Sequence, residues 1–284
     1  MFATLQCGRF QLSLKRPLVM GVVNVTPDSF FDGNVHFRVN QAIEHGLRLV
    51  QDGADILDIG GESTRPGAQV VAADEELRRL LPVIQGLLDA GVPLSVDTCK
   101  PEVMRQVLHA GADMINDIRG FSSDEAIQAV QDADCALCLM HMQGEPRTMQ
   151  QTPCYDDVVA EVQAYLAAGA QRLRDAGIAA NRIALDPGFG FGKTVAHNYT
   201  LLNQLPQVMG DAYPCMVGLS RKSMIGALTG RPASQRLGGS VAAALAAAVR
   251  GAHILRVHDV ADTVDALTIW SAINDPTLTE GARA

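Results

Sequence analysis

The sequence predicts an α/β fold, a single (β/α)8 TIM barrel with a small N-terminal hairpin. Eight short apolar runs have the length and composition of buried strands. Nearly every run is followed by a polar cluster and then by a helical pattern, and the connections are too long for hairpins, as in a parallel barrel. An open doubly wound sheet is the alternative. Since no linker divides the chain, we expect one domain, with the hairpin over residues 1–16, the barrel over 17–275 and a tail over 276–284.

The first elements follow this order from the N-terminus. Phe2–Lys15 alternates loosely around Gly8 and predicts the hairpin, which would cap one end of the barrel. Leu18–Val23 is the first continuous apolar run and leads into a long polar loop. A helical pattern follows over Val39–Gln51, and Gly53 closes it.

The same unit then repeats along the chain. The second strand, Ile56–Ile59, ends in a polar loop with glycines and precedes a helix over Asp74–Asp89. The third strand, Val92–Val96, ends at Asp97, and Pro101 begins the next helix because proline suits a first helical turn. The remaining predicted strands are Met114–Ile115, Cys135–Met140, Ile183–Leu185, Met216–Leu219 and Ile254–Val257.

The loop after the sixth strand, Asp186–Thr194, indicates a binding site. Asp186 stands at the carboxyl end of the strand, and three glycines allow a positive φ while they place Phe189 and Phe191 beside the carboxylate. Two aromatic rings next to an acid suit a flat heterocycle. The Gly-Lys-Thr that ends the loop is also the tail of a phosphate-binding P-loop, but Pro187 holds the place of that motif's first glycine, and a dinucleotide fingerprint lacks its third glycine. A purely structural turn is the other alternative.

Composition narrows the class of protein. The chain is 48% hydrophobic and 19% charged, which is ordinary for a globular protein, and its formal net charge of −8 argues against nucleic acid binding through the overall field. It has no run long enough to span a membrane and no export signal, so we expect a cytoplasmic protein with no membrane partner. Cys135 and Cys138 are not expected to share a metal, because residues three apart in a strand point to opposite faces.

A barrel gathers the residues that follow its strands on one face, whatever their separation in sequence. Here that collection combines acids and amides, which suit a nitrogen-rich heterocycle, with basic groups that suit an anion. Its members are Asn24, Asp58, Thr64, Arg65, Asp97, Asn116, His141, Asp186, Lys222, Ser223, Arg256 and His258.

Seven segments, in order along nearly the whole chain, closely resemble the dihydropteroate synthases, a family of pterin-binding barrels. They are Gly21–Phe30, Asp58–Gly67, Ser95–Thr98, Asn116–Asp117, Asp186–Thr194, Gly218–Ser223 and Arg256–Asp259. The resemblance implies condensation of 6-hydroxymethyl-7,8-dihydropterin pyrophosphate with 4-aminobenzoate, which releases pyrophosphate and forms 7,8-dihydropteroate. It also implies assistance by Mg²⁺, inhibition by sulfonamides and a homodimer formed through outer helices.

The resemblance assigns roles to the matching positions of this chain. The pterin would be bound by Asp97, Asn116, Met140, Asp186, Phe191 and Lys222. The pyrophosphate would be bound by Asn24, Thr64, Arg65, Arg256 and His258, with the magnesium ion on Asn24. The aminobenzoate would be bound by Phe30, Asp32, Arg65, Pro66, Phe191 and Ser223. The catalytic residues would be Asp97, Lys222, Arg256 and His258.

The chemistry of these side chains agrees with such roles. Asp186 is a two-point acceptor for an amino-pyrimidine edge, and an arginine with a metal ion stabilises charge on departing pyrophosphate. Each residue also has a structural alternative: His258 as a buried structural histidine, Asp97 as a helix cap, Arg256 as an ion-pair partner. For Asp58 and His141 we expect supporting roles.

Two other functions are alternatives to the synthase. A related barrel that transfers methyl groups from folates to a corrinoid has no pyrophosphate to hold, so Arg256 and His258 speak against it. A non-catalytic relative would not need the loop residues Asn24, Asp32, Thr64 and Arg65, so their presence speaks against it.

The sequence also predicts an oligomeric state. The segment Ser240–Ala252 consists almost entirely of small residues, so we expect this helix to pack closely on a neighbour, in agreement with a homodimer.

Overall fold

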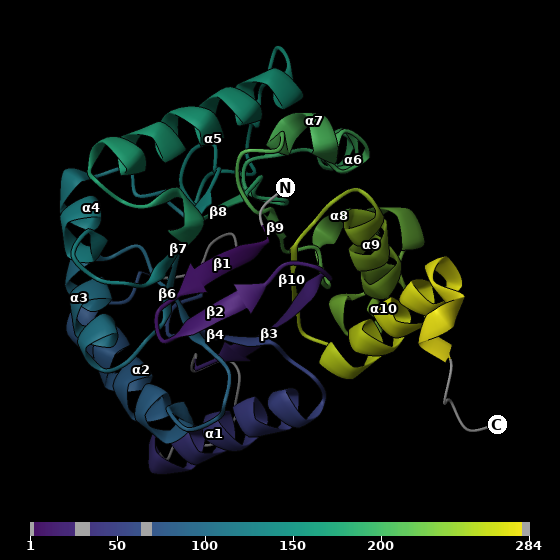
Figure 1. The fold of residues 1–284 in the computed structure, drawn as a ribbon. Helices are drawn as coiled ribbons and strands as arrows, with labels where there is room; N and C mark the ends of the chain where they lie inside the picture. Colours follow the sequence, from purple (N-terminus) through teal and green to yellow (C-terminus); the bar gives the residue numbers. More distant parts are fainter. Residues whose placement is uncertain (1–2, 26–34, 64–69, 280–284) are drawn as a thin grey trace.

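A ring of eight parallel strands forms the centre of the protein (Figure 1), whose computed structural model describes residues 3–25, 35–63 and 70–279. The strands follow one another in the order β8-β7-β6-β5-β4-β3-β10-β9. They are β3 (Leu18–Asn24), β4 (Ile56–Gly60), β5 (Leu94–Asp97), β6 (Met114–Asp117), β7 (Ala136–Met140), β8 (Ile183–Asp186), β9 (Met216–Val217) and β10 (Ile254–Val257). The ring closes between β8 and β9, where Leu185 and Cys215 form a parallel bridge. The predicted barrel is therefore confirmed.

Helices cover the outside of this ring (Figure 1). They are α1 (Val35–Gln51), α2 (Ala73–Leu87), α3 (Pro101–His109), α4 (Asp124–Val130), α5 (Val158–Asp175), α6 (Val195–Asn203), α7 (Leu205–Met209), α8 (Ser223–Thr229), α9 (Leu237–Val249) and α10 (Val260–Asn274). Short 3₁₀ turns are η2 (Ala180–Arg182), η3 (Ala233–Gln235) and η4 (Pro276–Thr279). None of these helices, within the described residues, is long and apolar enough to cross a membrane.

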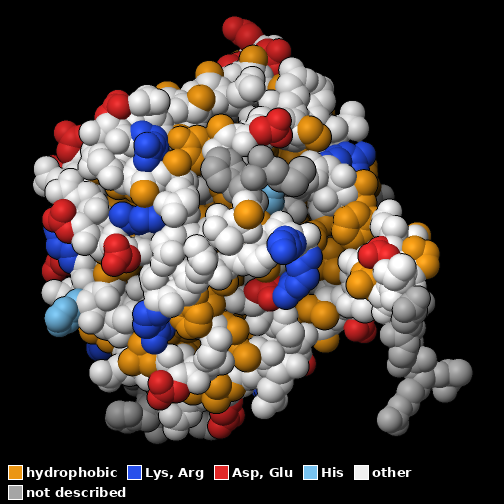
Figure 2. Space-filling view, in the orientation of Figure 1, with side chains coloured by type: hydrophobic (Ala, Val, Ile, Leu, Met, Phe, Trp, Pro, Cys, Tyr) orange, Lys and Arg blue, Asp and Glu red, His pale blue; other side chains and the backbone are white. Residues whose placement is uncertain are grey.

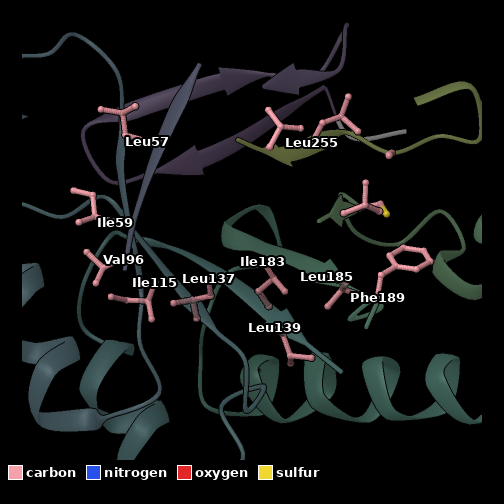
Figure 3. Close-up of a cluster of buried hydrophobic side chains, with 14 of the residues drawn as sticks. Leu57, Ile59, Val96, Ile115, Leu137, Leu139, Ile183, Leu185, Phe189 and Leu255 are labelled. Atoms are coloured by element: carbon pink, nitrogen blue, oxygen red, sulfur yellow. The ribbon is translucent and has the colours of Figure 1, made fainter. Parts of the chain in front are cut away.

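Outward-facing strand side chains form the main hydrophobic core. Leu57, Ile59, Val96 and Ile115 belong to a cluster that includes Leu80 of α2, so the core lies between the strands and the helices (Figure 3). This burial is the dominant stabilising term of the fold. Cys135 belongs to the same outer cluster, whereas Cys138 lies in the inner one, so the predicted opposite orientation of the two thiols is confirmed.

Inside the barrel the side chains change from apolar to polar along β4, β6 and β10. Met114, Ile56 and Ile254 lie in the inner apolar cluster, and two residues further along the same strands come Asn116, Asp58 and Arg256. Because side chains of a strand alternate between its two faces, both sets point inward. The polar layer therefore lies at the carboxyl ends of the strands, where a barrel carries its functional site.

The N-terminal hairpin, β1 (Thr4–Cys7) and β2 (Phe10–Ser13), closes the opposite end of the barrel (Figure 1). Its Leu5 and Cys7 are fully buried in the inner apolar cluster. Arg9 anchors the hairpin by donating to both carboxylate oxygens of Asp113, at 3.0 Å from Nε and 2.9 Å from Nη2. Figure 2 shows this end of the molecule, where acidic and basic side chains are interspersed rather than gathered by sign.

Most elements differ from the sequence-based expectation by one or two residues at an end, and two bounds near the site illustrate why. Helix α1 begins at Val35, before the predicted Val39. Strand β9 ends at Val217 rather than at Leu219, because the chain turns there: the Lys222 N–H donates to the Leu219 carbonyl at 3.2 Å, and Arg221 adopts a left-handed φ of 59°. This turn brings Lys222 to the start of α8.

Candidate active site

The predicted site residues that the structure describes lie at the carboxyl ends of the strands or directly after them. These are Asn24, Asp97, Asn116, Met140, Asp186, Phe191, Lys222, Ser223, Arg256 and His258. The register of the sheet pairs Gly60 with both Asn24 and Asp97, so these two side chains flank one glycine. Five predicted residues, Phe30, Asp32, Thr64, Arg65 and Pro66, lie outside the described residues.

A charge network of Asp58, Asp97 and Arg256 occupies the inside of the barrel. Arg256 donates from Nε to Asp58 Oδ2 at 2.6 Å and from Nη2 to Asp97 Oδ2 at 3.1 Å. Asp58 is fully buried and also accepts from Ser95 Oγ at 2.6 Å and from Asn116 Nδ2 at 3.3 Å. Arg256 is therefore an ion-pair partner, as one alternative predicted, although the two hydrogens on its Nη1 are not used in this network.

Burial and neighbouring charges act on the network in opposite directions. Burial raises the pKa of Asp97, while the Arg256 guanidinium works to lower it and the carboxylate of Asp58 adds to the rise. The two carboxylates in turn raise the pKa of Arg256 against its burial. One guanidinium between two acids leaves the network with one negative charge when both acids are ionised. Asp97 is not a helix cap, because the N-cap of α3 is Lys100.

Two buried oxygens beside this network have no hydrogen-bond partner among the described residues. They are Asp97 Oδ1 and Asn116 Oδ1. Asp97 and Asn116 are paired across β5 and β6, so the two acceptors belong to neighbouring positions of the barrel wall. Since an unsatisfied buried acceptor costs about 1–3 kcal/mol, such a pair is expected where a ligand with N–H groups binds.

The glycine loop, Pro187–Gly192, shapes the other side of the site. Asp186 Oδ1 accepts from the Gly188 N–H at 2.7 Å, which turns the chain directly after β8. Gly188 has a φ of +68°, and a Cβ there would lie 1.8 Å from the His141 carbonyl oxygen, so this position requires glycine. Burial raises the pKa of Asp186, and the ammonium of Lys222 opposes the rise.

Lys222 reaches this loop from the start of α8. Its ammonium donates to the Phe189 carbonyl and lies 4.8 Å from the centroid of the Phe191 ring. Burial lowers the pKa of Lys222 to about 8, although Asp186 favours its charged form. A Cβ on Gly218 would lie 3.8 Å from Arg256 Cβ and 3.9 Å from Lys222 Nζ, so the loop side and the charge network meet at one point.

The last predicted residues lie at the rim of the site. Ser220 Oγ accepts from the His258 N–H at 3.3 Å and lies 3.0 Å from His258 Nδ1, which fixes the start of the chain after β10 beside the turn before α8. Ser223 is the exposed first residue of α8. Both positions lie at the open end of the barrel rather than in its interior.

Comparisons with known proteins agree with this geometry. A family model described as pterin binding enzyme matches residues 20–258. The chain is 52% identical over 273 residues to the dihydropteroate synthase of Neisseria meningitidis serogroup C, covering 94% of this chain and 96% of that relative. This chain belongs to the dihydropteroate synthase family.

Solved structures of other synthases have the same fold. The Burkholderia cenocepacia dihydropteroate synthase, complexed with 7,8-dihydropteroate, is 54% identical with a TM-score of 0.89 and covers 98% of this chain and 100% of its own. The Xanthomonas albilineans dihydropteroate synthase, with 4-aminobenzoic acid, is 54% identical with a TM-score of 0.91 and covers 97% and 99%. Identity of more than 50% to synthases over nearly the whole chain decides against the corrinoid methyltransferase and the non-catalytic relative.

The donors present fit a magnesium ion that a substrate helps to bind. Within the described residues there is no group of three His, Cys, Asp or Glu side chains that could hold a metal alone. Asn24 supplies one hard oxygen at the end of β3, beside Gly60. Mg²⁺ typically takes one or two protein oxygens together with phosphate oxygens and water.

Sequence reasoning missed the connections of two residues in the synthase. Asp58 received only a supporting role, although it is the buried centre of the charge network; its place two positions after inward-facing Ile56 was the available signal. For Lys193 the sequence predicts no role of its own, although it lies in the segment Asp186–Thr194 that resembles the family. The structure instead buries its ammonium behind the glycine loop, and no pattern in the sequence indicated this.

Proposed function

We propose that this synthase binds the dihydropterin ring deep in the barrel, against Asp97, Asn116 and Asp186, and the pyrophosphate group nearer the rim, against Arg256 and His258. The observation that supports this division is the pair of unpartnered acceptors, Asp97 Oδ1 and Asn116 Oδ1. A pterin carries ring N–H and amino groups that can satisfy such acceptors. A pyrophosphate carries only acceptors and would leave them unsatisfied.

The remaining pterin contacts come from the loop side of the site. Asp186 has one oxygen engaged by Gly188 and a second that can accept from the amino-pyrimidine edge. Phe191 and Met140 would contact the ring faces, and the Lys222 ammonium would donate to ring oxygen or nitrogen. Because Lys222 already lies over the Phe191 ring, a flat ligand in this position would meet a donor that is held in place.

At the anion end, Arg256 would act with groups at the rim. Its Nε and Nη2 are engaged by Asp58 and Asp97, so Nη1 is the nitrogen left to donate to pyrophosphate. His258 would add a donor, and Asn24 would hold the magnesium ion. When bound, that ion would supply positive charge to the departing phosphate oxygens.

The chain's own residues would stabilise both charges that develop in the reaction. The carbon–oxygen bond to pyrophosphate breaks, the aminobenzoate nitrogen bonds to the same carbon, and one proton leaves the amine for solvent. Arg256 faces the negative charge of the leaving group, while the Asp97 carboxylate faces positive charge on the pterin. The aminobenzoate would lie at the rim near Ser223, and Phe30, Asp32, Thr64, Arg65 and Pro66 remain predicted contacts.

Binding of a pterin without pyrophosphate tests the inner pocket. Asn116→Leu removes one unpartnered acceptor at nearly constant volume, so calorimetry should show affinity weaker by about tenfold or more. Ser95→Ala is the control, because the Ser95 hydroxyl donates to Asp58 but its oxygen is not one of the unpartnered acceptors. Equal affinity of Asn116→Leu and the unaltered synthase would place the pterin elsewhere.

We also propose that the synthase is a homodimer through its C-terminal helices. Large apolar side chains are exposed on α8, α9, α10 and η4, and hydrophobic side chains gather on this side of the molecule (Figure 2). They are Leu228, Leu237, Val249, Ile269, Ile273 and Leu278. Covering such a surface is typical of a homodimer interface. Sedimentation at micromolar concentration should give the mass of two chains, and Ile273→Glu should give that of one; a monomeric mass of the unaltered chain would remove the proposal.

A further inference from the structure

Lys193 is a buried lysine that the proposed reaction does not use. Its side chain follows the glycine loop and is 2% exposed. The three hydrogens of its ammonium have three acceptors: His141 Nδ1 at 2.8 Å, the Gly188 carbonyl at 2.9 Å and the Phe191 carbonyl at 3.0 Å. Within the described residues it forms no ion pair with a carboxylate.

A buried ammonium without a carboxylate partner is unfavourable for folding. Burial lowers the pKa of Lys193 to about 7, although Asp186 favours its charged form, and the ammonium of Lys222 adds to the fall. A methionine of similar length would fill this space without that cost. The presence of the lysine therefore calls for a reason in the contacts that it makes.

Those contacts fix the path of the glycine loop. Lys193 draws the Gly188 and Phe191 carbonyls toward the interior, and the Phe191 N–H also donates to the Gly188 carbonyl at 3.1 Å. The intervening Phe189 carbonyl accepts from Lys222 instead. The two lysines thus hold three carbonyls of the turn between Gly188 and Phe191, so the turn that Lys193 holds also determines where the Lys222 ammonium is bound.

Lys193 also determines the state of His141. While Lys193 is charged its ammonium can only donate, so Nδ1 of His141 accepts and the neutral ring carries its proton on Nε2. Burial, and then the charge of Lys193, lowers the pKa of His141 to about 3, which keeps the ring neutral at working pH. The His141 N–H donates to the Asp186 carbonyl at 3.0 Å, and Lys193 adds a second link between the ends of β7 and β8 through His141 Nδ1 and the Gly188 carbonyl.

We propose that Lys193 is a positioning residue of the pterin pocket: its ammonium fixes the Gly188–Phe191 turn and the His141 ring, and through them the places of the Phe191 ring and the Lys222 ammonium. The proposal rests on the assignment of the inner pocket to the pterin. It assigns Lys193 no contact with the substrate.

Lys193→Met tests this role, and Arg182→Met is a matched control. Arg182 is also buried and also donates to backbone carbonyls, those of Cys135 at 2.8 Å and Val130 at 3.1 Å, but it precedes β8 at the end distant from the site. Both variants lose a buried cation that holds carbonyl groups. A purely structural role for Lys193 would make the two variants behave alike.

The readouts are thermal stability, the two KM values, and calorimetric binding of a pterin without pyrophosphate. Lys193→Met should weaken pterin binding by about tenfold or more and raise the KM for the pterin substrate far more than that for aminobenzoate. Arg182→Met should lower thermal stability while its pterin affinity stays within about twofold of the unaltered enzyme. If folded Lys193→Met binds the pterin as tightly as Arg182→Met does, the proposal is wrong. If the unaltered enzyme fails to bind the pterin, the pocket assignment is wrong instead.

A measurement on the unaltered protein covers the case in which Lys193→Met does not fold. Nitrogen-15 NMR of the histidines, with His141 assigned by the signal lost in His141→Asn, should show an unprotonated Nδ1 and a protonated Nε2 between about pH 5 and 6, where Lys193 is charged. A protonated Nδ1 in that range would overturn the proposal, because Lys193 would then have no acceptor there.

Discussion

Replacing Arg256 by methionine should destabilise the synthase by about 3–5 kcal/mol, because the substitution breaks a buried ion-pair network from one side. Two charge-assisted hydrogen bonds are lost, to Asp58 at 2.6 Å and to Asp97 at 3.1 Å, each contributing about 1.5–3 kcal/mol. Asp58 is fully buried and Asp97 is 7% exposed, so neither carboxylate can regain water without movement of the barrel wall. Apolar contacts of the methionine offset part of this loss.

A double-mutant cycle in urea at neutral pH measures the effect. Asp58→Asn removes the more deeply buried charge. The double variant should therefore lose less free energy of unfolding than the two single variants lose together, by about 2 kcal/mol or more. Arg256→Met within about 1 kcal/mol of the unaltered protein would refute the reasoning, since the carboxylates would then be shown to need no partner. Because Arg256 also holds Asp97, this variant should lose some affinity even for a pterin without pyrophosphate.

Three further predictions concern the loop side of the site. Asp186→Asn replaces an acceptor by a donor and should weaken pterin binding by about 1–3 kcal/mol in calorimetry; unchanged binding would show that this carboxylate does not face the ring. Since burial lowers the pKa of Lys222 to about 8, its ammonium is charged below that pH, so pterin affinity should fall as pH rises through 8, and Lys222→Met should abolish this dependence; a persisting slope would assign it to another group. Gly188→Ala should abolish pterin binding, because its Cβ would lie 1.8 Å from the His141 carbonyl oxygen. Gly177→Ala is the control: this glycine also has a left-handed φ, of 85°, but a Cβ there would meet nothing within 4 Å, so the variant should lose only about 1 kcal/mol of stability and bind the pterin normally. Equal effects of the two variants would contradict the steric argument.

The fold could be predicted because its signals are local and repeated. Each apolar run ends at a polar residue, as Ile183–Leu185 does at Asp186, and barrel geometry then brings these ends together without knowledge of the contacts. Bounds were less certain where tertiary contacts decide them. Strand β9 ends at Val217 because the chain turns before Arg221, which has a left-handed conformation. The propensities of the intervening residues do not predict this turn.

The sequence predicts which residues form the candidate site but not which of them contact one another. Arg256 and Asp58 lie far apart in sequence, and their pairing depends on the register across β3, β4 and β10. The sequence therefore places both residues at the barrel's open end without showing that they hold each other. The contact between Lys193 and His141 could not be predicted for the same reason, since a side-chain contact across two loops leaves no periodic pattern in the sequence.

The N-terminal hairpin has a kinetic consequence for the enzyme. Because Leu5 and Cys7 pack into the inner apolar cluster, the barrel is closed at the hairpin end. Both substrates and the product must therefore pass through the end at which the strands have their carboxyl termini. In the proposed arrangement the pterin occupies the deeper position, so it has to arrive before aminobenzoate, and dihydropteroate has to depart before the next pterin enters. Shortening the hairpin would impair folding without creating a second exit, because the residues beneath it are themselves core.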